Sequence, residues 1–260
     1  MDNFRTYGKP PFSIILIHGG PGAIGEMAPV AERIGERFGI LELLNRGLSI
    51  SEQLEELNSC IEMCPNGNPV LVGFSWGAWL SIIFAAIYQG KIKKLIVIGC
   101  GPLEDHYSNT IFETRISRLD QEQRKEFLDL LEGIENSCTI DRNQVFGNLG
   151  KLVSKSDCFD AIENSDHTTE IDANVYIKVW NEASALRKQG ILMNDLSNIK
   201  CPVIVIHGDY DPHPKEGILQ PLKQMQCNYR VKILKKCGHK PWIEKFAQEA
   251  FFKTLFRHLE

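Results

Sequence analysis

The 260-residue chain contains no stretch that approaches the roughly 20 uninterrupted apolar residues needed for a membrane-spanning helix. Its first residues, MDNFR, have neither a basic start followed by an apolar run nor a small-residue cleavage site, so no secretion signal is predicted. We therefore expect a water-soluble, cytoplasmic protein that has no membrane partner.

The sequence also lacks a CxxC pair, the spacing that commonly binds zinc or carries redox chemistry. Its eight cysteines are scattered along the chain, and most are expected to be reduced core residues. Cys60 and Cys64 share one face of a predicted helix, where we favour ordinary packing over a redox or metal role. We expect no metal and no cofactor.

A basic stripe is equally absent, because 29 Lys and Arg are mixed with 33 Asp and Glu for a formal net charge of −4. Such a chain offers no continuous surface for a phosphate backbone, so nucleic acid is not an expected partner. The expected partner is a small molecule, and the oligomeric state is not indicated.

What the sequence does contain is a series of short apolar runs that end in glycine or turn residues. Runs that are apolar at consecutive positions predict strands covered on both faces, and so a parallel sheet in an α/β fold. The predicted strands are Phe12–Ile17, Gly39–Leu44, Pro69–Val72, Lys94–Ile98, Val203–Ile206 and Arg230–Leu234, and helices are predicted over Gly25–Phe38, Ser51–Met63 and Gly77–Tyr88.

The strand pattern stops between residues 102 and 198, where charged helical periodicity replaces it. Strand signal returns at Val203, so we expect residues 102–198 to form a helical cap inserted into one core made of residues 1–101 and 199–260. Only about eleven residues precede the first strong strand, which is short for a two-stranded hairpin.

The most specific motif is Gly73-Phe74-Ser75-Trp76-Gly77, directly after one predicted strand and directly before a helix. A serine hydroxyl becomes a useful nucleophile only when it is exposed, oriented and met by a base. A sharp turn between strand and helix exposes it, and the glycines allow the two elements to approach closely. This context favours Ser75 as a nucleophile over a merely structural turn.

A second motif, His18-Gly19-Gly20-Pro21-Gly22, follows the first strong strand. Such a loop leaves backbone N–H groups free to stabilise an oxyanion, and the expected donors are Gly20 and Trp76. A glycine-rich structural turn is the alternative. His18 itself is interpreted as a hydrogen-bonded residue of the loop scaffold, and not as an acid or base.

The third motif, His207-Gly208-Asp209-Tyr210-Asp211-Pro212-His213-Pro214, offers two carboxylates after the penultimate predicted strand. Asp211 lies further past the strand end and is the expected acid, which leaves Asp209 as a turn residue. A rival hypothesis makes His207, Asp209, Asp211 and His213 metal ligands. The prolines argue against the regular extension that this needs.

The fourth motif, Cys237-Gly238-His239-Lys240-Pro241-Trp242, lies between the last predicted strand and the closing helix. An imidazole with an ordinary pKa near 6.5 can accept the serine proton at neutral pH and return it to a leaving group. His239 is therefore the expected base, with a carboxylate that fixes its tautomer.

These four motifs, in this order, resemble the α/β-hydrolase superfamily. The HGGPG loop, with a tryptophan directly after the serine, is similar to the proline iminopeptidase branch, whose members are cofactor-free serine hydrolases with a helical cap. The resemblance implies Gly19 and Gly20 in the oxyanion loop, Ser75 as nucleophile, Asp211 as acid and His239 as base. The short N-terminus departs from this family, because it implies that the usual first two strands are missing or reduced, and we expect a compact, mostly parallel sheet.

Two departures concern substrate recognition. Arg46-Gly47-Leu48-Ser49 stands where the family usually has a loop with an aspartate. Iminopeptidases hold the free amine of the substrate with cap glutamates, and Trp180-Asn181-Glu182 is the nearest candidate. Glu182 and Trp180 are thus expected substrate contacts, with ordinary helix surface as the alternative.

The leading hypothesis is a serine hydrolase that cleaves a small ester or amide through an acyl-serine intermediate. Serine at the elbow excludes the relatives that displace at carbon through an aspartate. The alternatives are an N-terminal aminopeptidase that acts on short peptides, and a binding protein that keeps the fold without turnover.

Overall fold

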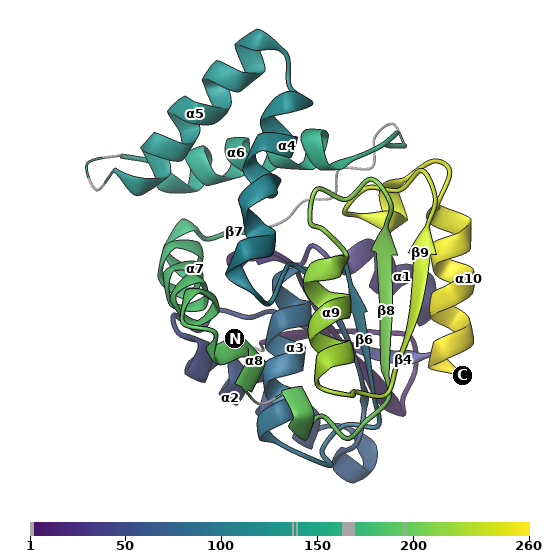
Figure 1. The fold of residues 1–260 in the computed structure, drawn as a ribbon. Coiled ribbons are helices and arrows are strands. Elements are labelled where there is room, and N and C mark those ends of the chain that lie inside the picture. The colour runs from purple at the N-terminus through teal and green to yellow at the C-terminus, as the bar shows by residue number, and fades with distance from the viewer. Residues whose placement is uncertain (1–2, 137, 139, 163–169, 195) are drawn as a thin grey trace.

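Seven strands form one twisted sheet in the order β1-β4-β2-β5-β6-β8-β9 (Figure 1). The structure, a computed structural model, describes residues 3–136, 138, 140–162, 170–194 and 196–260. All neighbouring strands are parallel except β1 and β4. The strands are β1 (Phe4–Tyr7), β2 (Phe12–Ile17), β4 (Gly39–Leu43), β5 (Val70–Phe74), β6 (Lys94–Ile98), β8 (Val203–Gly208) and β9 (Tyr229–Leu234).

Helices cover both faces of this sheet, which is why its strands are apolar at consecutive positions. In β2, Ile15 and Ile17 face one core while Ile14 and Leu16 face the other, and all four are buried. The first core packs against α2 (Ile50–Glu62), α3 (Trp76–Ile87) and α9 (Glu216–Gln224), and the second against α1 (Ala28–Gly35) and α10 (Gln248–Leu259). The predicted mostly parallel sheet flanked by helices is confirmed.

The N-terminus is reduced to one short strand before β2. Strand β1 does not form a hairpin with β2 but pairs antiparallel with β4, from Phe4 opposite Leu43 to Tyr7 opposite Ile40. Its Tyr7 hydroxyl donates to Glu42, a fully buried carboxylate on β4, at 2.7 Å. The few residues before β2 thus serve as an edge strand that covers a buried charge.

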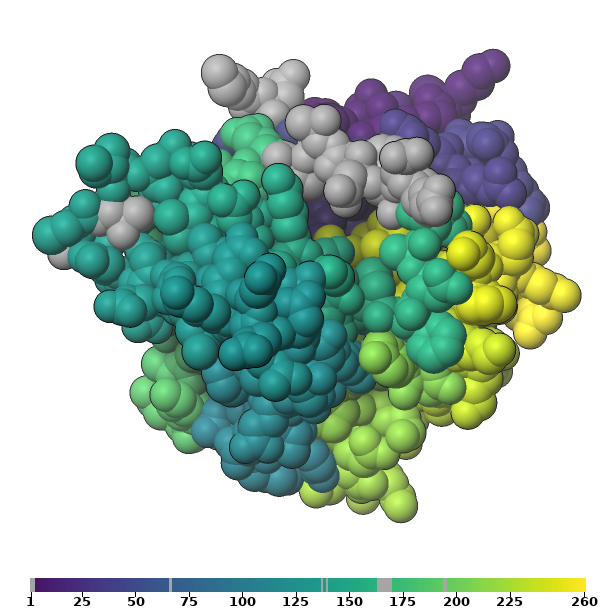
Figure 2. All heavy atoms as spheres, turned by 90° about the horizontal axis from the view of Figure 1, so that it is seen from above, coloured from purple at the N-terminus to yellow at the C-terminus, as the bar shows by residue number. Residues whose placement is uncertain are grey.

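Within the described ranges, residues 102–198 are largely helical. Their α8 (Ile191–Asn194) lies lower, at the level of α2 and α3, whereas α4 (Asn109–Ser117), α5 (Gln121–Glu135) and α6 (Arg142–Asp157) lie beyond the carboxyl ends of the parallel strands (Figure 1). Seen from that side, the segment from α4 to α6 covers much of the molecule (Figure 2). A small core of Leu119, Phe127, Leu149 and Leu152 holds part of it together. The elements are η2 (Asp105–Ser108), α4 (Asn109–Ser117), α5 (Gln121–Glu135), α6 (Arg142–Asp157), β7 (Glu170–Ile171), α7 (Ala173–Lys188), α8 (Ile191–Asn194) and η3 (Leu196–Asn198).

A two-stranded sheet joins this helical segment to the core, because β3 (Ala23–Ile24) pairs antiparallel with β7. The Asp172 N–H also donates to the Gly22 carbonyl at 2.9 Å. The HGGPG loop is therefore fastened to the start of α7. The remaining short elements are η1 (Pro65–Gly67) and η4 (Pro241–Ile243).

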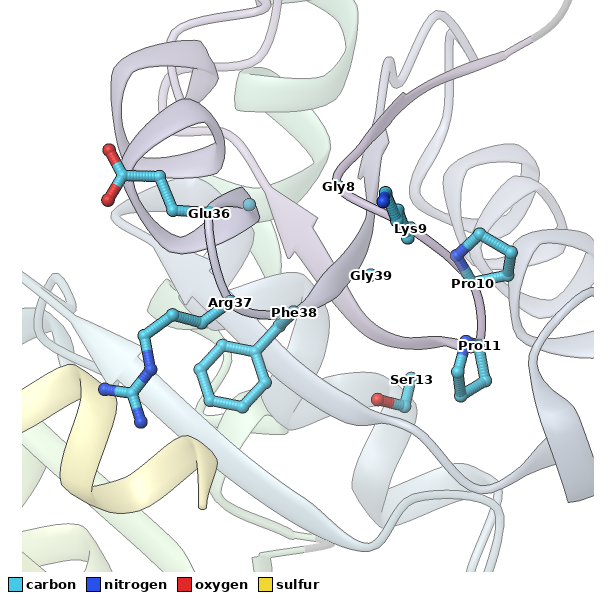
Figure 3. A pocket seen from close by; sticks show the side chains of 10 residues that line it. Gly8, Lys9, Pro10, Pro11, Ser13, Glu36, Arg37, Phe38 and Gly39 are labelled. Atoms are coloured by element: carbon cyan, nitrogen blue, oxygen red, sulfur yellow. The ribbon is translucent and has the colours of Figure 1, made fainter.

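A surface hollow lies at the amino ends of β2 and β4, lined by residues such as Lys9, Ser13 and Phe38 (Figure 3). The motif residues follow the carboxyl ends of their strands, at the opposite edge of the sheet. This hollow is therefore remote from the motifs. Within the described ranges, no helix is long and apolar enough to cross a membrane.

Glu244 links the loop of His239 to the segment after α6. Its fully buried carboxylate accepts the N–H groups of Gly238 at 2.7 Å, Phe159 at 2.8 Å and Asp160 at 2.9 Å. Three donors compensate the carboxylate for its lost hydration.

We predict that Glu244→Gln lowers the free energy of unfolding by about 1–3 kcal/mol. The reason is that the NH2 group of glutamine replaces one accepting oxygen and faces a backbone N–H, so that two donors oppose each other. Urea unfolding measures this change. Glu249→Gln, at an exposed position of α10, is the matched control. Equal stability of the two variants would contradict the account of Glu244.

Candidate active site

Ser75, Asp211 and His239 meet at the carboxyl edge of the sheet. Ser75 follows β5, Asp211 follows β8 and His239 follows β9, and parallel strands bring these ends to the same edge. The Nε2 atom of His239 lies 3.1 Å from Ser75 Oγ, and its Nδ1 atom lies 2.8 Å from Asp211 Oδ2. Residues more than 160 positions apart thus form one hydrogen-bonded chain.

Ser75 has φ 51° and ψ −110°, a backbone conformation that is rare for a residue with a side chain. Its N–H donates to the Ile98 carbonyl at 2.9 Å, which ties the turn to β6. A Cβ at Gly73 would overlap the Gly77 carbonyl, and one at Gly77 would overlap the Ile17 and His18 carbonyls. The sharp turn therefore requires both glycines.

The HGGPG loop lies against this turn, as the close approach of Gly77 to the end of β2 shows. Gly20 has φ +25°, and a Cβ at Gly19 would lie 2.6 Å from the Phe74 ring. Among the described residues, neither the Gly20 nor the Trp76 N–H donates to a protein acceptor. Within the described ranges, both predicted oxyanion donors thus lack an internal acceptor.

The side chain of Trp76 is held by a hydrogen bond to α2. Its indole N–H donates to Gln53 Oε1 at 2.8 Å, and Gln53 Nε2 donates to the Gly47 carbonyl at 2.9 Å. Gln53 is fully buried on α2. The loop that departs from the family pattern at Arg46 therefore supports the residue after Ser75.

His18 is buried, and its Nδ1 lies 2.7 Å from the Gly19 carbonyl. Burial lowers its pKa below the ordinary value, a direction that the Gly19 carbonyl opposes only in part. A neutral imidazole bonded to its own loop matches the scaffold role predicted from the sequence.

The Asp211 carboxylate is fully buried among three imidazoles. Besides His239, it contacts His213, whose Nδ1 lies 2.8 Å from Oδ1, and His207, whose Nε2 lies 3.6 Å from Oδ2. Burial alone would raise the pKa of Asp211, but His239, His213 and His207 together hold it well below its ordinary value. The Asp211 side chain is therefore ionised at neutral pH.

Comparison with known proteins identifies the family to which this architecture belongs. The sequence model of the alpha/beta hydrolase fold family matches residues 13–246. The chain belongs to the α/β-hydrolase fold family. A search of curated protein sequences found no match.

Solved structures agree with this chain in fold at low sequence identity. VinJ is 17% identical with a TM-score of 0.70, over 98% of this chain and 93% of that one. The monoacylglycerol lipase of Paleococcus ferrophilus is 18% identical with a TM-score of 0.62, over 98% and 97%. The proline iminopeptidase of Mycobacterium smegmatis is 15% identical with a TM-score of 0.60, over 98% and 93%. At these identities the likeness is one of fold.

The loop that carries His239 is held in place by contacts with residues that are distant in the sequence. A Cβ at Gly99, which has φ +53°, would lie 3.0 Å from His239 Nδ1. The Phe74 ring packs against the imidazole with centroids 4.8 Å apart. The His239 N–H donates to the Asp157 carbonyl at the end of α6, at 2.9 Å. The helical segment thus helps to place the predicted base.

Two ion pairs flank the site. Arg115 on α4 binds Asp157 through Nε at 2.8 Å and Nη2 at 2.6 Å, and Lys240 lies 2.6 Å from Glu26. Burial would raise the pKa of Asp157, but Arg115 outweighs it and lowers the pKa. The second pair joins the base loop to the segment that follows HGGPG.

Asp209 does not reach the histidines. It accepts the Cys237 N–H at 3.3 Å and lies 3.5 Å from Lys235 Nζ. In the described part of the chain, the group with metal-ligand spacing is Asp211, His213 and His239, whose donor atoms lie within 4.8 Å of one another. Both imidazoles lie at hydrogen-bond distance from separate oxygens of the carboxylate. The eight cysteines are all free, and Cys60 and Cys64 are buried in the core.

Glu182 and Trp180 lie on α7. The Glu182 carboxylate accepts the Ile50 N–H at 2.8 Å, at the start of α2. Trp180 stacks with Trp79 at a centroid distance of 5.9 Å and with Tyr176 at 6.5 Å. Glu182 thus serves to fasten α7 to α2, and substrate binding by these two residues stays a prediction.

Several residues of the site have no signal in the sequence. Arg115 and Asp157 are distant from every motif, and their pairing depends on how α4 and α6 pack. The sequence pattern indicates His213 only as a metal ligand, because a sequence does not show which carboxylate oxygen an imidazole faces. Glu26 follows the HGGPG loop and Lys240 follows His239. Their ion pair can be predicted from these positions only when the two loops are known to meet.

We predict that stability falls as the pH is lowered from 7.5 to 5. Burial lowers the pKa of His213 from 6.5 to about 4, against the opposing effect of Asp211. The unfolded chain therefore binds a proton at His213 that the folded chain does not, which costs about 2 kcal/mol at pH 5. Urea unfolding at both pH values measures the loss.

The matched variants are His213→Asn, which removes the titrating group, and His106→Asn, at an exposed position. The first should lose less stability on acidification than the natural protein, and the second should lose as much. The same pH dependence in all three proteins would exclude His213 as a source of the effect.

Proposed function

We propose that the protein is a serine hydrolase that cleaves a small ester or amide through an acyl-serine intermediate. The observation that carries the proposal is the continuous contact from Ser75 Oγ to His239 Nε2 and from His239 Nδ1 to Asp211, with Ser75 on a sharp backbone turn between β5 and α3. Nucleophile, base and orienting acid are the groups that acyl transfer requires.

In the proposed reaction, Ser75 Oγ attacks the substrate carbonyl carbon while its proton passes to His239 Nε2. Asp211 keeps its negative charge and stabilises the imidazolium through Nδ1–H. The carbonyl oxygen becomes an anion that the N–H groups of Gly20 and Trp76 stabilise, with Gly19 shaping the loop. His239 then protonates the leaving group, and a water molecule activated by the same imidazole releases the acid and restores Ser75.

The charges around the site favour a substrate without a free amine. Glu26 is paired with Lys240, Asp157 with Arg115, and Glu182 with a backbone N–H. A substrate ammonium group would have to displace one of these internal partners before it gained a carboxylate. We therefore favour a neutral ester or amide over the N-terminal aminopeptidase alternative.

We also propose that residues 102–198 act as a cap that selects the acyl substrate. Helices α4, α5 and α6 of this segment lie beyond the carboxyl edge of the sheet (Figure 1), and the start of α7 is fastened to the HGGPG loop through Gly22. Partly exposed aromatic rings of Trp180, Tyr176 and Phe146 stack along α7 and α6. Such rings would supply apolar contact area beside the reacting carbonyl.

A fluorophosphonate probe should label the natural protein rapidly and should not label Ser75→Ala, because only an activated serine attacks phosphorus at a useful rate. Ser117→Ala, at an exposed helical position, is the control and should be labelled normally. Hydrolysis of p-nitrophenyl acetate should follow the same pattern. A natural protein that resists the probe and leaves the ester intact would favour the ligand-binding alternative.

Free and N-blocked prolyl and alanyl amides test the aminopeptidase alternative. We expect no preference for the free amine, since Glu26, Asp157 and Glu182 already have partners within the protein. The ratio of kcat/KM values for the two forms is the measurement. A ratio above about ten, equivalent to 1.4 kcal/mol in favour of the free amine, would overturn this substrate assignment.

A further inference from the structure

Asp211 has a second histidine partner that the proposed reaction does not use. His213 places Nδ1 2.8 Å from Oδ1, and its backbone N–H donates to the same oxygen at 2.9 Å. His239 occupies the other oxygen, Oδ2. The two imidazole rings lie 4.4 Å apart, tilted by 32°, with the carboxylate between their Nδ1 atoms.

The contacts determine where the protons lie. An ionised carboxylate only accepts hydrogen bonds, so the Nδ1 atom of His213 carries a proton. The ring is mostly buried, with 13% of its side chain exposed, beside the Arg115 guanidinium and a second imidazole, and this environment keeps it neutral. Neutral His213 is therefore the Nδ1–H tautomer.

His207 forms a hydrogen bond to the backbone of the loop that carries His213. The Nε2 atom of His207 lies 2.9 Å from the His213 carbonyl, so it carries the proton, and the buried Nδ1 has no partner among the described residues. Because His207 is the penultimate residue of β8, the contact fixes the His213 backbone relative to the sheet. The position of the His213 imidazole is thus fixed by these contacts.

We propose that His213 is a positioning residue, which donates Nδ1–H to Oδ1 of Asp211 and so fixes the rotation of the carboxylate and limits the negative charge it presents to His239. The effect of His213 on catalysis rests on the proposed function. The hydrogen bonds of the two imidazoles to one carboxylate do not depend on what the chain binds.

No other side chain in the described part of the chain supplies a hydrogen bond to Oδ1. The charged and titratable groups that act on the cluster are His207 from β8, Arg115 from α4, Asp157 from α6 and the buried thiols of Cys100 after β6 and Cys237 after β9. Arg115 is neutralised by Asp157. The His213 side chain is therefore the group whose removal changes the charge of Asp211 most directly.

The consequence is a change in the proton affinity of His239. A carboxylate that loses a donor keeps more of its charge for the remaining imidazole and stabilises the imidazolium more strongly. Without the His213 donor, His239 should thus hold its proton to a higher pH. A purely structural role for His213 would lower stability without moving this titration.

The test uses a matched pair at position 213. His213→Asn places an amide N–H where Nδ1–H stood, and His213→Leu has a similar size but no donor. NMR titration of the full chain gives the pKa of His239 in each protein, with the signal assigned by His239→Gln. We expect His213→Leu to raise that pKa by roughly 0.5–1 unit and His213→Asn to leave it within 0.2 unit.

The same titration spectra of the natural protein provide a test that needs no variant at position 213. The nitrogen chemical shifts of His213 should report the neutral Nδ1–H tautomer between pH 6 and 8. An Nε2–H tautomer there, or a charged ring, would overturn the proposal, as would an unchanged His239 pKa in His213→Leu. If His213→Leu does not fold, His213→Phe removes the donor with the ring volume kept.

Fluorophosphonate labelling separates this proposal from the proposed function. If the natural protein is labelled, the acid limb of its labelling rate should move to higher pH in His213→Leu by the same amount as the NMR titration. If it is not labelled, the hydrolase proposal fails while the NMR result still decides the role of His213. Labelled protein with coincident pH profiles in all variants would refute the positioning role.

Discussion

The backbone at Ser75 is the constraint on which the site depends. A residue with a side chain in this conformation costs of the order of 1–3 kcal/mol and persists only where its surroundings determine it. Here the Ser75 N–H is fixed to β6, and α3, buried on nearly every side, begins at the next residue. The neighbouring strands must then end in residues small enough to lie against the turn. A Cβ at Gly19, after β2, would meet the Phe74 ring, and a Cβ at Gly99, after β6, would meet the His239 imidazole. Both glycines are therefore packing requirements of the site.

Charge imposes a second requirement, because the site buries three carboxylates close together. Each is compensated differently: Asp211 by imidazoles, Asp157 by a guanidinium and Glu244 by backbone N–H groups. A buried carboxylate without such partners would take up a proton. The donors to Asp157 and two of the three donors to Glu244 lie in residues 102–198, so the helical segment belongs to the electrostatics of the core edge.

Much of this architecture could be predicted from the sequence, and the limits are physical. Strands β2 and β6 have the predicted bounds, because consecutive apolar residues flanked by turns are specific to a covered parallel sheet. The helix predicted from Gly25 begins only at Ala28, since Ala23–Ile24 form a strand with a partner about 145 positions away. Local periodicity carries no information about such a partner.

The site shows the same division between local and distant information. Ser75, Asp211 and His239 each follow a strand, so strand order alone brings them to one edge. The pairing of Arg115 with Asp157 depends on the packing of two helices whose sequence is mostly surface-like, and His213 depends on which oxygen a carboxylate turns toward it. Residues that act through geometry alone leave no motif to find.

The coupling between the helical segment and the base loop bears on how substrate choice can vary in this fold. The His239 N–H is bonded to the last residue of α6, and the same residue holds Arg115. A change in this part of the segment therefore disturbs the imidazole as well as any substrate contact. The aromatic rings on α7 have no such bond to His239, and their partly exposed edges can change with less effect on the base. Under the proposed function, substrate specificity would be free to diverge along α7, whereas the end of α6 would be constrained by its contact with His239.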